Sequence, residues 1–323
     1  MWNDKNIVFL ISMPRSGSTL LQRILATHTD IATTSESWLL LPQLYALKEG
    51  SVFSEYSHIT SSRAINDFCE CMPDKADGYL KTIKSALVNC YRSVADDETK
   101  FFLEKTPRNN LVLNEIVAMF PESKYILLWR NPAAIVASMI NSFSNGKWNI
   151  YRHEIDLFKG LENMLGADTL NIKYRHDIKY EDLVTAPSKI MDELCHFLGL
   201  SSVPLNFSIL NNYPLQGRMG DKSGVHEYQH ISASSLDKWR LSFSNPLRKR
   251  WLIKYLEYIG SEDLSRMGYD KDELMRSISS IEFGSQHLLS DMLRMTYGAL
   301  DARFQISLIC KLHNQNKRKY VLQ

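Results

Sequence analysis

A short polar segment near the amino terminus has the residue types that bind a phosphate or sulfate group. Residues 13–19 lie between an apolar run and an amphipathic stretch. A helix beginning here would offer unpaired backbone N–H groups and the positive end of its dipole to an anion. Gly17 permits close approach of the backbone, and Arg15 adds a planar fork of donors. Hydroxyl donors come from Ser16, Ser18 and Thr19.

This segment differs from the phosphate loop of ATP and GTP enzymes, in which a glycine opens the loop and a lysine precedes the last hydroxyl residue. Kinases place that lysine on the β- and γ-phosphates and the hydroxyl on magnesium. Neither the first glycine nor the lysine is present here. These absences count against a phosphoryl transferase, which is the alternative enzyme class. A serine-capped helix that binds no ligand is the alternative without a function for the loop.

A second polar pair follows another apolar run. Arg130 comes directly after residues 125–129, and Ser138 lies about two helical turns later. Open α/β sheets bind their ligands at the carboxyl ends of strands. An arginine and a serine at such a position can bind a second phosphate, although either one alone could be an ordinary surface residue.

These segments need strand–helix units to bring them together. Short apolar runs with β-branched residues predict buried strands, and stripes of apolar residues at helical spacing predict helices. Asn131 and Pro132 suit the start of a helix, and Gly199 suits the end of one. Strands are expected at 7–13, 125–129 and 174–180, and helices at 19–28, 133–143 and from 187 to about 199.

Alternation of strands and helices predicts an α/β fold with a P-loop-like central parallel sheet flanked by helices. Residues 38–98 are expected to form a helical insertion over the sheet edge. The chain after residue 240 reads as a helical C-terminal extension. We therefore expect a single domain over 1–323, with its nucleotide-binding core at about 5–240.

The composition narrows the functional classes. The 323 residues include 38 basic and 36 acidic side chains, so the net charge of +2 gives no general attraction to nucleic acid. The five cysteines are few and lack zinc-ligand spacing, so no metal is expected. With no signal peptide and no apolar run long enough to span a bilayer, we expect a cytoplasmic protein.

Taken together, the two phosphate-binding segments resemble the nucleotide signatures of sulfotransferases that use 3'-phosphoadenosine-5'-phosphosulfate (PAPS). The form of residues 14–19 and the acidic segment 34–37 are most similar to the tyrosylprotein and bacterial carbohydrate branch. The resemblance extends over about 5–240. Further similar blocks lie at 104–108, 120–124, 180–183, 197–200 and 236–239.

The resemblance implies a set of nucleotide contacts. The 5'-phosphosulfate would be bound by Arg15, Ser16, Gly17, Ser18 and Thr19, and the 3'-phosphate by Arg130 and Ser138. Tyr180 would lie near the nucleotide. A loop formed by residues 223–232, which begins at Ser223, would close over the nucleotide together with Lys238. One departure from the family pattern is Ser142, which stands where tyrosylprotein relatives have an arginine.

The implied reaction moves a sulfuryl group from PAPS to an acceptor hydroxyl, with desulfated PAP as the product. Cations and N–H groups would stabilise the negative charge. The candidates are Arg15, Lys105 and the N–H groups of the loop, with Ser223 as a further hydrogen-bond donor. The position of Glu36 matches the family's catalytic base, which takes the acceptor proton. His28 and His153 are alternative bases.

Acceptor identity is not readable from the sequence. We expect the acceptor to be a carbohydrate hydroxyl, on a polysaccharide or a lipid-linked sugar, and give peptide tyrosine and small phenols as the next candidates. The non-catalytic alternative is a protein that binds polyanions or membrane surfaces. It depends on basic residues at 248–250, Lys254 and 317–319, which could equally guide an anionic acceptor.

Overall fold

The computed structural model describes the chain except for residues 1, 51, 206–235, 308 and 311–323. The chain divides into two compact units. Unit 1 comprises Met1–Arg130 and Phe158–Ala233, and unit 2 comprises Asn131–Leu157 and Ser234–Gln323. The division falls within the segment expected to be the nucleotide core, and the expectation of a single domain stays a prediction.

Unit 1 is built on a parallel sheet of five strands in the order β2-β3-β1-β4-β5. The central strand β1 (Ile7–Ser12) is fully buried, as are the side chains that follow Lys124 in β4. Burial on both faces explains why these strands read as continuous apolar runs. The predicted α/β class is confirmed. The strands are β1 (Ile7–Ser12), β2 (Ile31–Thr33), β3 (Phe101–Glu104), β4 (Lys124–Trp129) and β5 (Tyr174–Lys179).

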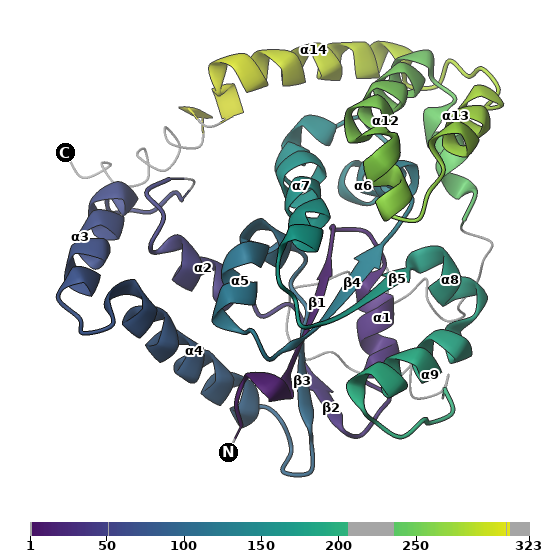
Figure 1. Ribbon diagram of the computed structural model, residues 1–323. Coiled ribbons are helices and arrows are strands. Elements are labelled where there is room, and N and C mark those ends of the chain that lie inside the picture. Colours follow the sequence, from purple (N-terminus) through teal and green to yellow (C-terminus); the bar gives the residue numbers. More distant parts are fainter. Residues whose placement is uncertain (1, 51, 206–235, 308, 311–323) are drawn as a thin grey trace. The chain divides into compact units, whose positions relative to one another are not determined.

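Helices cover both faces of this sheet. Helix α1 (Ser18–Leu25) lies on one face, and α5 (Leu113–Met119) and α7 (Leu161–Leu165) lie on the other (Figure 1). Every side chain of α1 is buried. Among the described residues, the other α-helices of unit 1 are α2 (Leu40–Tyr45), α3 (His58–Glu70), α4 (Lys75–Ser93), α8 (Tyr180–Thr185) and α9 (Pro187–Leu198).

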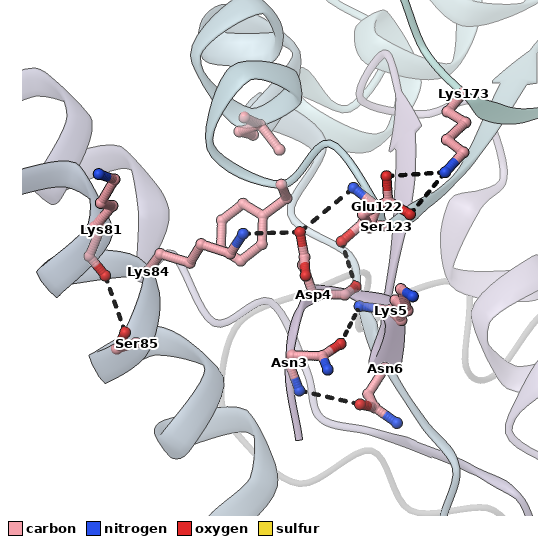
Figure 2. Close-up of polar contacts among 12 residues, drawn as sticks. Asn3, Asp4, Lys5, Asn6, Lys81, Lys84, Ser85, Glu122, Ser123 and Lys173 are labelled. Carbon is pink, nitrogen blue, oxygen red and sulfur yellow. Dashed lines mark hydrogen bonds and ion pairs between the residues drawn. The ribbon is translucent and has the colours of Figure 1, made fainter. Parts of the chain in front are cut away.

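The amino end of the sheet is closed by a polar cluster shown in Figure 2. Lys84 of α4 forms an ion pair of 2.7 Å with Asp4, which precedes β1. The buried hydroxyl of Ser123 donates a hydrogen bond of 2.6 Å to the carbonyl oxygen of Asp4. This cluster lies at the edge where the strands begin, opposite their carboxyl ends.

Unit 2 is helical and contains a buried ion pair. Arg248 is 4% exposed and its guanidinium contacts both carboxylate oxygens of Asp291, which is fully buried. The interpretation of 248–250 as a surface cluster is therefore wrong for Arg248. The α-helices of unit 2 are α6 (Pro132–Ser144), α12 (Pro246–Arg266), α13 (Lys271–Ser279) and α14 (Leu288–Phe304). None of the helices in the described residues is both long and apolar enough for a bilayer crossing.

Candidate functional site

Each strand of the sheet has a predicted site residue close behind its carboxyl end. Arg15 follows β1 by three residues, Glu36 follows β2 by three, and Lys105 follows β3 directly. Arg130 follows β4 directly, and Tyr180 follows β5. Because the strands are parallel, these residues collect at one edge of the sheet, the edge at which α/β folds bind ligands.

The loop between β1 and α1 has two residues in the left-handed region, Arg15 with φ 71° and Gly17 with φ 90°. Left-handed residues in such a loop turn backbone N–H groups toward a common point and form an anion-binding nest. Gly17 is the N-cap of α1, so the open N–H groups of the helix face the same loop. The hydroxyl of Ser16 is buried and has no hydrogen-bond partner in the described part of the chain.

Arg130 connects this loop to the residue after β5. Its Nη1 donates a hydrogen bond of 2.7 Å to the backbone carbonyl of Arg15. Its guanidinium lies 4.1 Å above the ring centre of Tyr180, a cation–π contact. The ring of Tyr180 also covers Gly17, where a β-carbon would lie 2.3 Å from Cδ2. The buried Nε of Arg130 has no partner among the described residues and is a donor suited to a phosphate.

The second group of contacts surrounds Glu36. The ammonium of Lys105, whose side chain is 1% exposed, donates to Glu36 Oε1 at 3.2 Å and to Thr19 Oγ1 at 3.4 Å. The indole Nε1 of Trp38 donates to Glu36 Oε2 at 3.1 Å. The predicted base and the predicted cation are therefore in direct contact, and Thr19 links them to the phosphate loop.

Sequence reasoning missed a buried carboxylate beside this pair. Glu104 is 2% exposed and accepts hydrogen bonds from Ser37, Thr106 and Asn109. Burial raises the pKa of Glu104, while those three donors and the charge of Lys105 act against the shift. The sequence signals were a carboxylate at the end of an apolar strand and its place in the block 104–108 that resembles the family.

Not every predicted contact falls in unit 1. Ser138 lies on α6, two turns after the N-cap Asn131, and therefore belongs to unit 2 together with Ser142. Lys238 is exposed at the start of a short 3₁₀ helix of unit 2. Ser223 and the predicted closing loop 223–232 lie outside the described residues.

The two alternative bases lie elsewhere. His28 follows the far end of α1, and both of its ring nitrogens are occupied by the backbone. Its Nδ1 accepts from the N–H of Asp30 at 3.0 Å, so Nε2 carries the proton and donates to the carbonyl of Ser201 at 3.1 Å. His153 belongs to unit 2 and lies 3.9 Å from Asp156. In the described ranges, no cluster of His, Cys, Asp and Glu has the arrangement of a metal site.

Two known proteins are similar to this chain in sequence. Nodulation protein NoeE of Sinorhizobium fredii (strain NBRC 101917 / NGR234) is 36% identical over 137 residues, which are 41% of this chain and 30% of that protein. Protein-tyrosine sulfotransferase 1 of Danio rerio is 23% identical over 247 residues, covering 73% of this chain and 66% of that protein. The chain thus spans about a third to two thirds of these relatives.

Solved structures of similar chains include the sulfotransferase domain from the curacin biosynthetic pathway. That domain is 25% identical, with a TM-score of 0.48 over 73% of this chain and 90% of its own. The sequence pattern of the sulfotransferase family matches residues 7–204, which span all five strands and the residue behind each of them. The chain belongs to the sulfotransferase family.

Proposed function

We propose that the chain transfers a sulfuryl group from PAPS to an acceptor hydroxyl, with carbohydrate as the leading acceptor class. The observation that carries the proposal is the junction at Thr19. This residue belongs to the phosphate loop and contacts Lys105, which in turn contacts Glu36. Transfer of a group between two bound substrates requires that the donor and the acceptor be held next to each other. Here Lys105 connects the loop proposed to bind the donor with the carboxylate proposed to act on the acceptor.

The loop and Arg130 supply the donor site. The nest at 15–17, the N–H groups that open α1 and the hydroxyl of Ser16 suit the 5'-phosphosulfate. Arg130 suits the 3'-phosphate, because its Nε has no partner in the described residues while the Tyr180 ring holds the guanidinium plane. Ser138, Ser223 and Lys238 stay sequence-based candidates for the same nucleotide.

PAPS supplies a sulfuryl group on a phosphate leaving group. The acceptor oxygen forms the new S–O bond, the bond from sulfur to the phosphate oxygen breaks, and its electron pair leaves with PAP. Glu36 takes the acceptor proton in this proposal. Lys105 stabilises the negative charge on the transferring group, since its ammonium lies between the loop hydroxyl and the carboxylate.

One observation supports a ring-shaped acceptor. The half-buried indole of Trp38 lies beside the proposed base, and aromatic side chains pack against sugar rings and phenols. The names of several relatives specify protein tyrosine, which also has an aromatic ring. We keep carbohydrate as the first proposed acceptor class, with tyrosyl peptides and phenols as the alternatives.

Ligand-dependent melting separates this proposal from a kinase. PAP at concentrations far above its Kd should raise the Tm, and ATP with magnesium should not. Labelled PAPS is then offered with lactose, a tyrosyl peptide and phenol, and the labelled product is identified. A chain that is stabilised by ATP with magnesium but not by PAP is not a sulfotransferase, and the kinase alternative replaces the proposal.

A further inference from the structure

Glu104 lies at the centre of a buried network that joins two segments of the site. Its Oε2 accepts a hydrogen bond of 2.8 Å from the hydroxyl of Ser37. Its Oε1 accepts from Thr106 Oγ1 at 2.7 Å and from Asn109 Nδ2 at 3.3 Å. The network thereby connects the segment after β2 to the segment after β3.

The residue after Ser37 has an unusual backbone. Trp38 has φ 56°, in the left-handed region that bulky side chains rarely adopt and that persists only where the surroundings impose it. Two contacts hold this turn: the Ser37 hydroxyl on Glu104, and the Trp38 N–H, which donates to Thr106 Oγ1 at 3.3 Å. Since Thr106 itself donates to Glu104, both contacts converge on the same carboxyl.

The turn determines where the Trp38 indole lies. Its Nε1 donates to Glu36 Oε2 at 3.1 Å, and Lys105 holds Oε1 of the same carboxylate at 3.2 Å. Lys105 follows Glu104 directly in the chain. The Glu104 carboxyl thus holds the turn that carries one donor to Glu36, and the residue next to Glu104 in the chain carries the other donor.

We propose that Glu104 is a positioning residue, which holds the Trp38 turn and thereby orients the Glu36 carboxylate toward the acceptor hydroxyl. This inference rests on the proposed function. A carboxylate on a segment without these contacts could rotate among several rotamers, and only one of them aims a lone pair at the proton. Burying a carboxyl group is costly unless its hydrogen bonds are made, and here three donors make them.

Ser37→Ala is the most selective variant, because it removes the bond from Glu104 to the turn and leaves the buried carboxyl its other two donors. It also removes the acceptor of the Leu39 N–H, which lies 3.3 Å from the Ser37 hydroxyl. The control is Ser123→Ala. Ser123 is another serine of unit 1 whose hydroxyl donates one hydrogen bond, but it lies at the opposite end of the sheet. Trp38→Phe removes the indole N–H together with the ring that carries it and keeps a smaller aromatic side chain. Glu104→Gln keeps the shape and most of the hydrogen bonds.

Two matched acceptors separate positioning from folding. Phenol must lose its proton during attack, whereas p-nitrophenol is largely ionised at mildly alkaline pH and needs no base. Ser37→Ala and Trp38→Phe should lower kcat with phenol about tenfold to a hundredfold. Ser37→Ala should leave kcat with p-nitrophenol within about twofold of the unmodified chain, as should Ser123→Ala with either acceptor. Ser37→Ala and Trp38→Phe should both leave the Kd of PAP within about twofold of its unmodified value. Glu104→Gln should lose less than Glu104→Ala.

The outcomes are distinct. If kcat falls equally with phenol and with p-nitrophenol, the network is merely structural and the inference is overturned. The same conclusion follows if the loss of kcat tracks the loss of Tm in all variants, including Ser123→Ala. Unchanged kcat with phenol in Ser37→Ala and Trp38→Phe also overturns it, and the proposed function then stands. A wild-type chain that binds PAP but transfers to no acceptor, water included, overturns the proposed function and this inference with it.

Discussion

The ring of Tyr180 occupies the space into which a side chain at position 17 would extend. A β-carbon on Gly17 would lie 2.3 Å from Cδ2 and 2.4 Å from Cε2 of that ring. Tyr180 in turn carries the guanidinium of Arg130 on its face. The phosphate loop therefore packs directly against the residues after β4 and β5. A methyl group added at position 17 would overlap the Tyr180 ring.

Gly17→Ala should consequently impair nucleotide binding. The substitution adds the strain of a left-handed φ, about 1 kcal/mol, and forces the Tyr180 ring away from the loop. We expect PAP affinity to fall at least about tenfold. Gly199→Ala is the control, since Gly199 also has a positive φ of 74° but open space around it. Loss of PAP affinity in both variants alike would contradict the role of the Tyr180 contact.

Arg130→Ala should distinguish two nucleotides. We expect a loss of about 10- to 100-fold in affinity for PAP, because a charge-assisted hydrogen bond contributes about 1.5–3 kcal/mol. Adenosine-5'-phosphosulfate, which lacks the 3'-phosphate, should lose less. Some loss is expected for both ligands, since Arg130 also supports the backbone at Arg15. Calorimetric titration of the two ligands checks this, and identical losses would show that Arg130 only shapes the loop.

Glu36→Gln should slow chemistry more than it weakens donor binding. General bases contribute about 10²–10⁴-fold, and the amide keeps the size of the side chain while removing the basic oxygen. Steady-state rates with phenol should fall in that range, with PAP affinity nearly unchanged. A rate close to normal would place the base elsewhere. His28 would then be a poor substitute, because the backbone occupies both of its ring nitrogens.

The buried carboxyl of Glu104 should give a pH-dependent stability difference. Burial raises the pKa of the Glu104 carboxyl in the folded chain above its ordinary value, so between the unfolded and the folded pKa the folded chain keeps a proton that the unfolded chain has lost. This contribution to stability is full below the unfolded pKa and is lost as pH rises through the folded pKa. As pH rises from about 4, the unmodified chain should therefore lose free energy of unfolding relative to Glu104→Gln, whose amide does not titrate. A difference that stays constant with pH would contradict it.

Removing metal ions should leave transfer unchanged. Arg15, Lys105 and the N–H groups that open α1 can supply the positive charge that magnesium supplies in kinases. The check is the rate of transfer from PAPS in EDTA and again after magnesium is added back. Activity that disappears in EDTA and returns with magnesium would contradict this prediction.

The sequence could predict the site residues that follow apolar strands, because burial and periodicity locate strands and parallel strands align their ends. Arg15 and Arg130 were found in this way, and Glu36 and Lys105 were found by resemblance. Position 38 was out of reach, because nothing in the local sequence forces a tryptophan into a left-handed turn. The contacts that impose that turn come from Glu104 and Thr106, nearly 70 residues away.

Tertiary contacts also determine whether Arg248 is buried or exposed. A run of three basic residues on a helix normally faces water, and its sequence gives no sign of a distant partner. The partner Asp291 lies on α14, and an unpaired Arg248 in its buried position would be strongly unfavourable. Pairings of this kind, between helices far apart in the chain, are invisible to local patterns.

The strand order also determines when the sheet can form during synthesis. Strand β1 is made first, yet its neighbours β3 and β4 follow only about a hundred residues later, with Ile7 beside Phe102 and Leu10 beside Ile126. Closing loops of this length costs entropy and slows folding. A strand whose first five residues are all apolar therefore leaves the ribosome long before its neighbouring strands can cover it. Chains stalled before β4 has emerged should bind holdase chaperones, and those stalled after β5 should not.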